Sequence, residues 1–485
     1  MTGKLSIASL SAALVVTSAL VILKLAARSQ WRREVDGRGG DPGRQLSRSG
    51  PRELLDELED RELETIRYQE EAVRRPRAEL FSGPDRVPGS WPGRPWGAGP
   101  VSSDWWGRAG RAVGHPLGCS EFRNITGIEF LGSGYTKTVL RGTLQDGTPI
   151  ALKTVNSQGD EVMCCVRRYG QTRDCHRLAA FKIIKEISLL QKLQHPNVIQ
   201  LYGQCYHGRL EDAPVITAMM ELGTPVEMIQ LLQTPWEERF RICLSLVKLL
   251  HYLAHSPLGS VLLLDFQPRQ FVIVDGELKV TDLDDVSTEE LSCKADSDCV
   301  LEFPTRNFNL PCTAEGKCHK INEKRNLYNA FRFFFTYLLP YSAPPALTPL
   351  LCEIMNATGD LRYGINKTLD TFEDVLYLYK SGFHHINHSQ SWLEDYKIFE
   401  GFRIRDHSDY KCWPSYNHQG CLLSVYNKEE AAAICHSQQQ CQSFIFTQRT
   451  TWLGRYLVSF RSSTELVLDV NSTVYMKSSS FKALM

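Results

Sequence analysis

Residues 261–285 read VLLLDFQPRQFVIVDGELKVTDLDD. The apolar runs on either side of the Asp-Gly pair at 275–276 predict a hairpin, and a further strand precedes Asp265. Asp265 opens the first loop, and Asp282 follows the last strand. Two carboxylates at strand ends suit phosphoryl transfer, because one accepts a hydroxyl proton and the other holds a metal ion on the phosphates. An apolar strand that ends in Asp is also common in ordinary turns, so neither residue decides the function alone.

A glycine-containing turn lies upstream, in IEFLGSGYTKTV at 128–139. Gly132 and Gly134 lack a Cβ, which lets a backbone approach phosphates closely, although a plain β-hairpin turn is the simpler interpretation. Lys137 stands where a third glycine often occurs in such loops. An apolar strand then ends at Lys153, about 20 residues after the turn, which is where a lysine can reach the α- and β-phosphates. The alternative for Lys153 is an edge-strand lysine in water.

The segment KEISLLQKLQHPNV at 185–198 predicts a helix that stops at Pro196. We expect Glu186 to point from this helix toward Lys153 and form an ion pair with it. The alternative is that Glu186 is an ordinary solvent-exposed glutamate of the helix. The longer stretch between these two residues contains Cys164, Cys165 and Cys175. We interpret it as a disulfide-stapled insertion at the front of the helix.

Composition limits the function classes. The chain has 485 residues, which suits two or three domains, and its formal net charge is zero. Without a basic field, nucleic-acid binding is disfavoured. Nine of the 15 cysteines follow position 290, and none forms a Cys-x-x-Cys pair. The six-residue spacings 293/299, 312/318 and 435/441 favour disulfide loops over a zinc site, and Cys352 is a candidate staple of a lower lobe.

Two features predict entry into the secretory pathway. Residues 5–23 are an uncharged apolar run typical of a signal peptide or an N-terminal membrane anchor, and cleavage stays open. The five Asn-x-Ser/Thr sequons predict glycosylation at Asn124, Asn356, Asn366, Asn387 and Asn471. We therefore expect a Golgi or secretory-pathway lumenal protein that is also secreted.

Changes in amino-acid composition along the chain divide it into five parts. We expect a signal or anchor at 1–27, an Arg/Pro/Gly-rich, largely disordered stem at 28–118, an N-terminal lobe at 119–223, a C-terminal lobe at 224–395 and a Cys-rich extension at 396–485. Inside the stem, the charge pattern of 51–75 predicts a short helix or weak coiled coil, with Leu54, Leu55, Leu58, Leu63 and Ile66 on one stripe. Further helices are expected near 177–194, 237–255 and 324–339. The extension is either a small disulfide module, loosely similar to apple-type domains, or an extension of the C-terminal lobe.

The order of Gly-x-Gly, Lys, Glu, Asp and Asp resembles that of protein kinases. From about Cys119 onward the chain resembles the vertebrate lonesome kinase family of extracellular tyrosine-protein kinases, through strings such as ALKTV, HPNV, NEKRNLYNAFRFFFTYLLP and CWPSYNHQGCLLSV. The resemblance implies a bilobal α+β kinase fold, ATP with Mg or Mn, and secreted and extracellular-matrix protein substrates. It implies the catalytic residues Asp265 (proton acceptor), Lys153, Glu186 and Arg269, and the metal ligands Asp282 and Gln270. It implies ATP contacts from Leu131, Gly132, Ser133, Gly134, Tyr135, Thr136, Lys137, Val139, Ala151, Lys153, Met220 and Glu221.

Departures from the kinase pattern matter as well. Leu263-Leu264 replaces the usual His-Arg before the base, Gln270 replaces the metal-binding Asn, and Asp284 replaces a glycine. Gln267 stands where Ser/Thr kinases typically have Lys, and Arg269 stands where tyrosine kinases often have Arg. The pattern therefore favours a tyrosine kinase. A pseudokinase scaffold and a kinase for sugar hydroxyls remain the alternatives.

Overall fold

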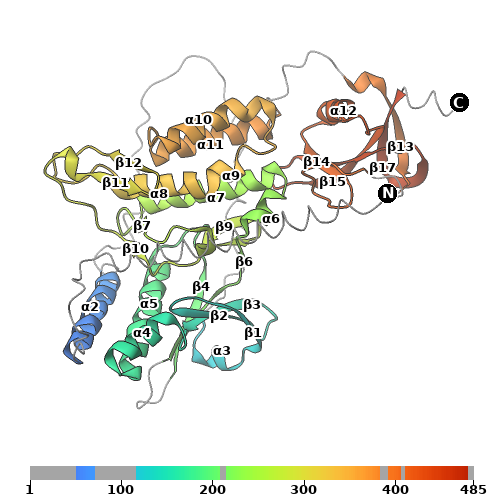
Figure 1. Ribbon diagram of the computed structural model, residues 1–485. Coiled ribbons are helices and arrows are strands. Elements are labelled where there is room, and N and C mark those ends of the chain that lie inside the picture. Colours follow the sequence, from blue (N-terminus) through green and yellow to red (C-terminus); the bar gives the residue numbers. More distant parts are fainter. Residues whose placement is uncertain (1–50, 71–115, 208–214, 383–391, 406–409, 479–485) are drawn as a thin grey trace, which may run out of the picture. The chain divides into compact units, whose positions relative to one another are not determined.

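The computed structural model describes residues 51–70, 116–207, 215–382, 392–405 and 410–478 (Figure 1). The expected leader at 1–27 and the sequon at Asn387 lie outside these residues. Within the described ranges, no helix is both long enough and apolar enough to cross a bilayer.

The N-terminal lobe is an antiparallel sheet in the strand order β1-β2-β3-β5-β4. Its helix α5 packs on β3 and β5, with Ile183 and Ile187 buried in the core shared with Ala151 and Ala218. The bounds are α3 (Cys119–Arg123), β1 (Thr126–Ser133), β2 (Lys137–Thr143), β3 (Pro149–Val155), α4 (Asp160–Tyr169), α5 (Thr172–Lys192), β4 (Leu201–His207) and β5 (Val215–Glu221). The sheet and α5 therefore fix the positions of Lys153 and Glu186.

Helix α4 is the predicted insertion before α5. A disulfide between Cys165 and Cys175 joins α4 to α5, while Cys164 remains a free thiol. A second disulfide, Cys119–Cys205, ties α3 to β4. The prediction of a stapled insertion is thus confirmed, with Cys164 outside the staple.

Helix α2 (Pro51–Glu70) confirms the predicted helix of the stem. The predicted apolar stripe is only partly right, because Leu54 and Leu58 are buried whereas Leu55, Leu63 and Ile66 are exposed. Polar side chains hold α2 on the lobe: Glu64 pairs with Lys185 of α5 at 2.6 Å, and Glu57 accepts a hydrogen bond from Tyr169 of α4. The stem therefore contributes a folded helix that contacts α4 and α5.

The C-terminal lobe is mainly helical (Figure 1). Apolar residues of α7 and α11 meet through stacked rings, with 5.5 Å between the centroids of Phe240 and Phe372. The bounds are β6 (Thr224–Pro225), α6 (Met228–Leu232), α7 (Trp236–Ala254), β7 (Leu262–Leu263), β8 (Phe271–Val274), β9 (Glu277–Val280), β10 (Val286–Ser287), β11 (Val300–Phe303), β12 (Arg306–Asn309), α8 (Ile321–Ala330), a π-helix (Phe331–Phe335), α9 (Thr336–Leu338), α10 (Thr348–Gly359) and α11 (Ile365–Lys380). This lobe and the N-terminal sheet confirm the predicted α+β architecture.

The hairpin predicted at the Asp-Gly pair is present. Strands β8 and β9 pair antiparallel, and Asp275 and Gly276 both have positive φ, as the favoured two-residue hairpin turn requires. The strand before Asp265, β7, pairs instead with β10, which follows the acidic cluster. This second pairing brings the start of the Asp265 loop close to the residues after Asp282.

Crossed disulfides shape the segment between β10 and α8. Cys293 pairs with Cys312, and Cys299 pairs with Cys318, across the β11–β12 hairpin. The expected six-residue loops 293–299 and 312–318 are therefore wrong, because the hairpin brings each cysteine opposite a more distant one. Cys352 is exposed and free, so the expected staple of the lower lobe is wrong as well.

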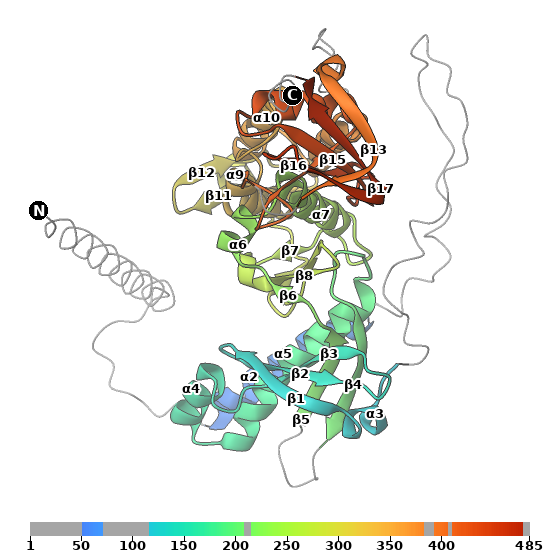
Figure 2. The same cartoon turned by 90° about the vertical axis from the view of Figure 1, so that its right-hand side faces the viewer.

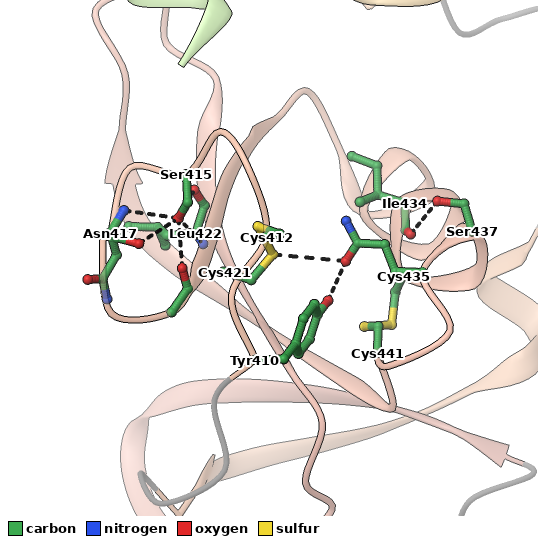
Figure 3. Close-up of a disulfide and its surroundings, with 12 residues drawn as sticks. Tyr410, Cys412, Ser415, Asn417, Cys421, Leu422, Ile434, Cys435, Ser437 and Cys441 are labelled. Atoms are coloured by element: carbon green, nitrogen blue, oxygen red, sulfur yellow. Dashed lines mark hydrogen bonds between the residues drawn. A yellow bond between two sulfur atoms is a disulfide. The ribbon is translucent and has the colours of Figure 1, made fainter. Parts of the chain in front are cut away.

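The Cys-rich extension forms a five-stranded sheet, ordered β13-β17-β15-β16-β14, with one helix packed on it (Figure 2). Its disulfides are Cys412–Cys421 and Cys435–Cys441, the second of which closes a predicted six-residue loop (Figure 3). The bounds are β13 (Tyr396–Ile404), β14 (Cys421–Val425), α12 (Lys428–Ser437), β15 (Ser443–Thr450), β16 (Tyr456–Arg461) and β17 (Leu466–Lys477). The extension thus has its own sheet, helix and core; the likeness to apple-type domains stays a prediction.

A buried polar interface joins this extension to the C-terminal lobe. The guanidinium of Arg455 lies 2.6 Å from the Glu430 carboxylate and donates to the carbonyl of Tyr379 at 2.8 Å. The Tyr379 hydroxyl lies 3.0 Å from the hydroxyl of Ser424, which donates to Glu237 of α7 at 2.8 Å. Buried hydrogen bonds and an ion pair therefore connect the extension to the C-terminal lobe.

Replacing the buried guanidinium tests this interface. Arg455→Met should lower the free energy of unfolding by about 3–5 kcal/mol, because it leaves the Glu430 carboxylate buried without its cation. The double variant Arg455→Met/Glu430→Gln should recover part of this loss, because neither charge then remains. Urea unfolding measures both.

A matched control comes from the same extension. Arg405 pairs with Glu465 at 3.1 Å on the surface, so Arg405→Met should cost at most about 1 kcal/mol. Equal losses for Arg455→Met and Arg405→Met would contradict a buried ionic interface.

Candidate functional site

Lys153 and Glu186 form a buried ion pair. The Lys153 ammonium lies 2.6 Å from Glu186 Oε1 and donates to the carbonyl of Thr281 at 2.8 Å. The apolar strand β3 brings Lys153 inward, and the packing of α5 on that strand brings Glu186 to it. The pairing that the sequence predicted for these two residues is present.

Asp282 and Asp284 follow strand β9. Asp282 Oδ1 lies 3.8 Å from the Lys153 ammonium, while Leu283 between the two carboxylates is fully buried in the core. Burial alone would raise the pKa of Asp282, but the charges of Lys153 and Lys137 lower it below its ordinary value. Burial, together with the neighbouring Asp282 charge, raises the pKa of Asp284. The buried Leu283 thus anchors two acidic side chains beside the lysines.

Lys137 is a second lysine in the same cluster. Its ammonium lies 2.6 Å from Glu186 Oε2, 2.6 Å from Asp282 Oδ1 and 3.1 Å from Asp284 Oδ2. Burial would lower the pKa of Lys137, but these three carboxylates raise it well above its ordinary value. Sequence reasoning placed Lys137 in the phosphate loop and missed this contact; its only signal was a lysine where a glycine often occurs.

Asp265 accepts hydrogen bonds from three side chains of its own loop. Gln267 Nε2 lies 2.8 Å from Oδ1, Arg269 Nη2 lies 2.9 Å from Oδ2, and the Gln270 amide also donates to Oδ2. These donors fix the orientation of the carboxylate. Because the Gln270 amide nitrogen donates to Asp265, only the side-chain carbonyl oxygen of Gln270 is left to bind a metal. The hydrogen bond from Gln267 also positions Asp265, and the sequence did not predict it.

The residues before Asp265 explain a departure from the usual pattern. Leu263 is buried in the core, whereas Leu264 is exposed. An arginine at the place of Leu264 would offer a counter-charge to a phosphorylated segment, and an exposed leucine offers none. This position therefore supplies no counter-charge to a phosphorylated segment.

The turn between β1 and β2 leads directly into Lys137. Leu131 and Tyr135 are exposed, and the Lys137 carbonyl accepts a hydrogen bond from the Gly134 amide at 2.8 Å. Asn156 holds the turn from outside, because its side chain donates to the Gly134 carbonyl and its amide donates to that of Thr136. These hydrogen bonds thus fix the backbone of the turn.

The predicted adenine-binding residues lie at the end of β5. Met220 is buried, and the Glu221 carboxylate is held by Lys279 at 2.7 Å. The Glu221 amide also donates to the Gln200 carbonyl at 2.9 Å, so both the side chain and the amide of Glu221 are engaged within the protein. Ala151 of β3 pairs with Met220, while Val139 of β2 pairs with Lys153.

The donor set suits a divalent metal. Asp282 and Asp284 offer carboxylate oxygens within reach of one ammonium, and Gln270 offers an amide oxygen. Mg²⁺ and Mn²⁺ prefer such oxygen ligands, and when bound on ATP they neutralise charge on the phosphates. The residues present therefore fit a metal–nucleotide complex.

The chain is similar to known protein kinases. A family model for the protein-kinase domain of FAM69 matches residues 180–357. The human extracellular tyrosine-protein kinase PKDCC is 56% identical over 367 residues, which cover 76% of this chain and 74% of that relative. The chain belongs to the PKDCC family of protein kinases.

More distant matches cover smaller shares of the chain. A leucine-rich repeat receptor-like serine/threonine-protein kinase of Arabidopsis thaliana is 31% identical over 28% of this chain and 11% of its own length. The receptor-like protein kinase ANXUR2 from the same organism is 24% identical over 52% of this chain and 27% of its own length. The PKDCC family membership establishes a kinase, a class that uses ATP and divalent metal ions.

Proposed function

We propose that this kinase transfers the γ-phosphate of ATP, with Mg²⁺ or Mn²⁺, to tyrosine hydroxyls of secreted and extracellular-matrix proteins. The observation that carries the proposal is the arrangement of Lys153, Glu186 and Asp282 around one buried ion pair. In it, Lys153 binds the phosphates, Glu186 holds Lys153, and Asp282 holds the metal. Asp265 accepts the proton of the substrate hydroxyl.

The loop around Asp265 supports tyrosine as the acceptor. Arg269 binds the Asp265 carboxylate, yet two thirds of its side chain is exposed, with 67% relative accessibility. It therefore orients the base while most of its side chain stays accessible to a substrate. Gln267 gives the loop no ammonium at the place typical of Ser/Thr kinases.

Several features support a secretory route. Six disulfides need an oxidising compartment, and the relative PKDCC is named an extracellular kinase. Four of the five sequons lie in the described part of the chain, and their asparagines Asn124, Asn356, Asn366 and Asn471 are all exposed. We propose the Golgi and secretory lumen and the extracellular space as the sites of action.

A pseudokinase is the second candidate. It is favoured by the Lys137 ammonium, which binds Asp282 where a kinase needs its metal. Such a protein would bind nucleotide and metal without transferring phosphate.

Labelling of secreted proteins with radiolabelled ATP separates the candidates. Purified protein should place the label on phosphotyrosine in phosphoamino-acid analysis. Label on glycans would indicate a sugar kinase. Thermal stabilisation by nucleotide and metal, with no transfer to a broad peptide library, would indicate a pseudokinase.

A further inference from the structure

Five charged groups share one buried site, and their charges do not cancel. Lys137 and Lys153 bring two positive charges, and Glu186, Asp282 and Asp284 bring three negative ones when ionised. The side chains of Lys137, Glu186 and Asp284 are 8%, 1% and 8% exposed, and that of Asp282 is 25% exposed. Carboxylates this close together repel one another when ionised, and burial strengthens that repulsion. They therefore need nearby cations to stay charged.

Lys137 supplies most of that compensation. It contacts all three carboxylates, whereas Lys153 contacts Glu186 and lies 3.8 Å from Asp282. A divalent cation on Asp282 and Asp284 would compete with the same ammonium. If Lys137 withdraws from Asp282 and Asp284 as the cation binds, the two positive charges of the cation match the two charges of these carboxylates, while Lys137 and Lys153 remain with Glu186.

The structure allows the ammonium to move while the backbone stays. The Lys137 carbonyl is fixed by the Gly134 amide at 2.8 Å, and the Thr136 carbonyl by the Asn156 amide at 2.8 Å. The flexible four-carbon side chain of a lysine can redirect its ammonium from such an anchor. The bond to Glu186 gives Lys137 one partner that a metal on the aspartates leaves in place.

We infer that Lys137 is an internal counter-cation that holds Asp282 and Asp284 in the metal-free kinase and is displaced from them by the divalent cation. Asp284 then acts as a second carboxylate ligand beside Asp282. The inference rests on the proposed kinase function for its metal, and it makes Lys137 a positioning residue for that metal.

Metal binding without nucleotide tests the exchange. Mn²⁺ affinity should be at least about tenfold higher in Lys137→Met than in the unaltered protein, because the competing ammonium is gone. Isothermal titration with Mn²⁺ alone measures it, and Mn²⁺ should also raise the melting temperature more in this variant. A purely structural role for Lys137 would leave the affinity equal or lower, which would overturn the inference.

Two further variants complete the design. Lys185→Met removes a lysine of similar burial whose ammonium pairs with Glu64 instead of the cluster, so its Mn²⁺ affinity should stay within about twofold. Asp284→Asn should weaken Mn²⁺ binding by at least about tenfold, because one ligand charge is lost. If Lys137→Met does not fold, Asp284→Asn decides, and unchanged affinity there overturns the inference. The Mn²⁺ titrations contain no phosphate acceptor, so their result does not depend on whether the protein phosphorylates tyrosine.

Discussion

Asp265→Asn should reduce phosphate transfer about a thousandfold or more while the protein stays folded. An amide cannot accept the hydroxyl proton, and a positioned base contributes about 10²–10⁴-fold in general. Its fold should survive, because the three donors to Asp265 come from the same loop and an asparagine oxygen still accepts from Gln267 or Arg269. The measurement is kcat with a tyrosine peptide, alongside the melting temperature.

The control for Asp265→Asn is Asp360→Asn. Asp360 also pairs with an arginine, at 2.8 Å from Arg306, but on the surface away from the site. Its kcat should remain within about twofold. A kcat for Asp265→Asn within about tenfold of the unaltered protein would contradict the role of Asp265 as the base.

Lys153→Met should lower kcat/KM for ATP by about a hundredfold or more. The variant removes the ammonium next to both Glu186 and Asp282, and charged groups that stabilise transferring phosphates are worth several kcal/mol in general. Helix α5 should stay in place, because Lys137 still binds Glu186 at 2.6 Å. Steady-state kinetics with varied ATP give the loss.

The outcome that would contradict this prediction involves the neighbouring Lys137. If Lys153→Met kept most of its activity and Lys137→Met lost it, Lys137 would be the phosphate-binding lysine. Lys185→Met is again the matched control, with a side chain 9% exposed compared with 6% for Lys153. Its kcat/KM should stay close to that of the unaltered protein.

Local patterns in the sequence were sufficient for much of the fold. The helices α5 and α7 and the β8–β9 hairpin follow from periodicity and from one Asp-Gly turn, which act between near neighbours. The pairing of Cys293 with Cys312 was not predictable, because it depends on the register of β11 and β12. The same holds for the attachment of α2 to α5, which rests on charges far apart in the sequence.

In the site, too, some features follow from the sequence pattern and others depend on residues far apart in the chain. The kinase order of Lys153, Glu186, Asp265 and Asp282 is legible in the sequence, and the structure brings Lys153, Glu186 and Asp282 together. The position of Lys137 is not legible, because its partners Glu186 and Asp282 lie 49 and 145 residues away. Spacing can place a lysine in a loop, but only the packed lobes decide which carboxylates surround it.

The most direct test of the central claim is single-turnover transfer from radiolabelled ATP to a tyrosine peptide, with Asp265→Asn measured beside the unaltered protein. We expect phosphotyrosine formation by the unaltered protein and almost none by the variant. Equal labelling by both, or no phosphotyrosine from a folded protein that binds ATP and metal, would contradict it.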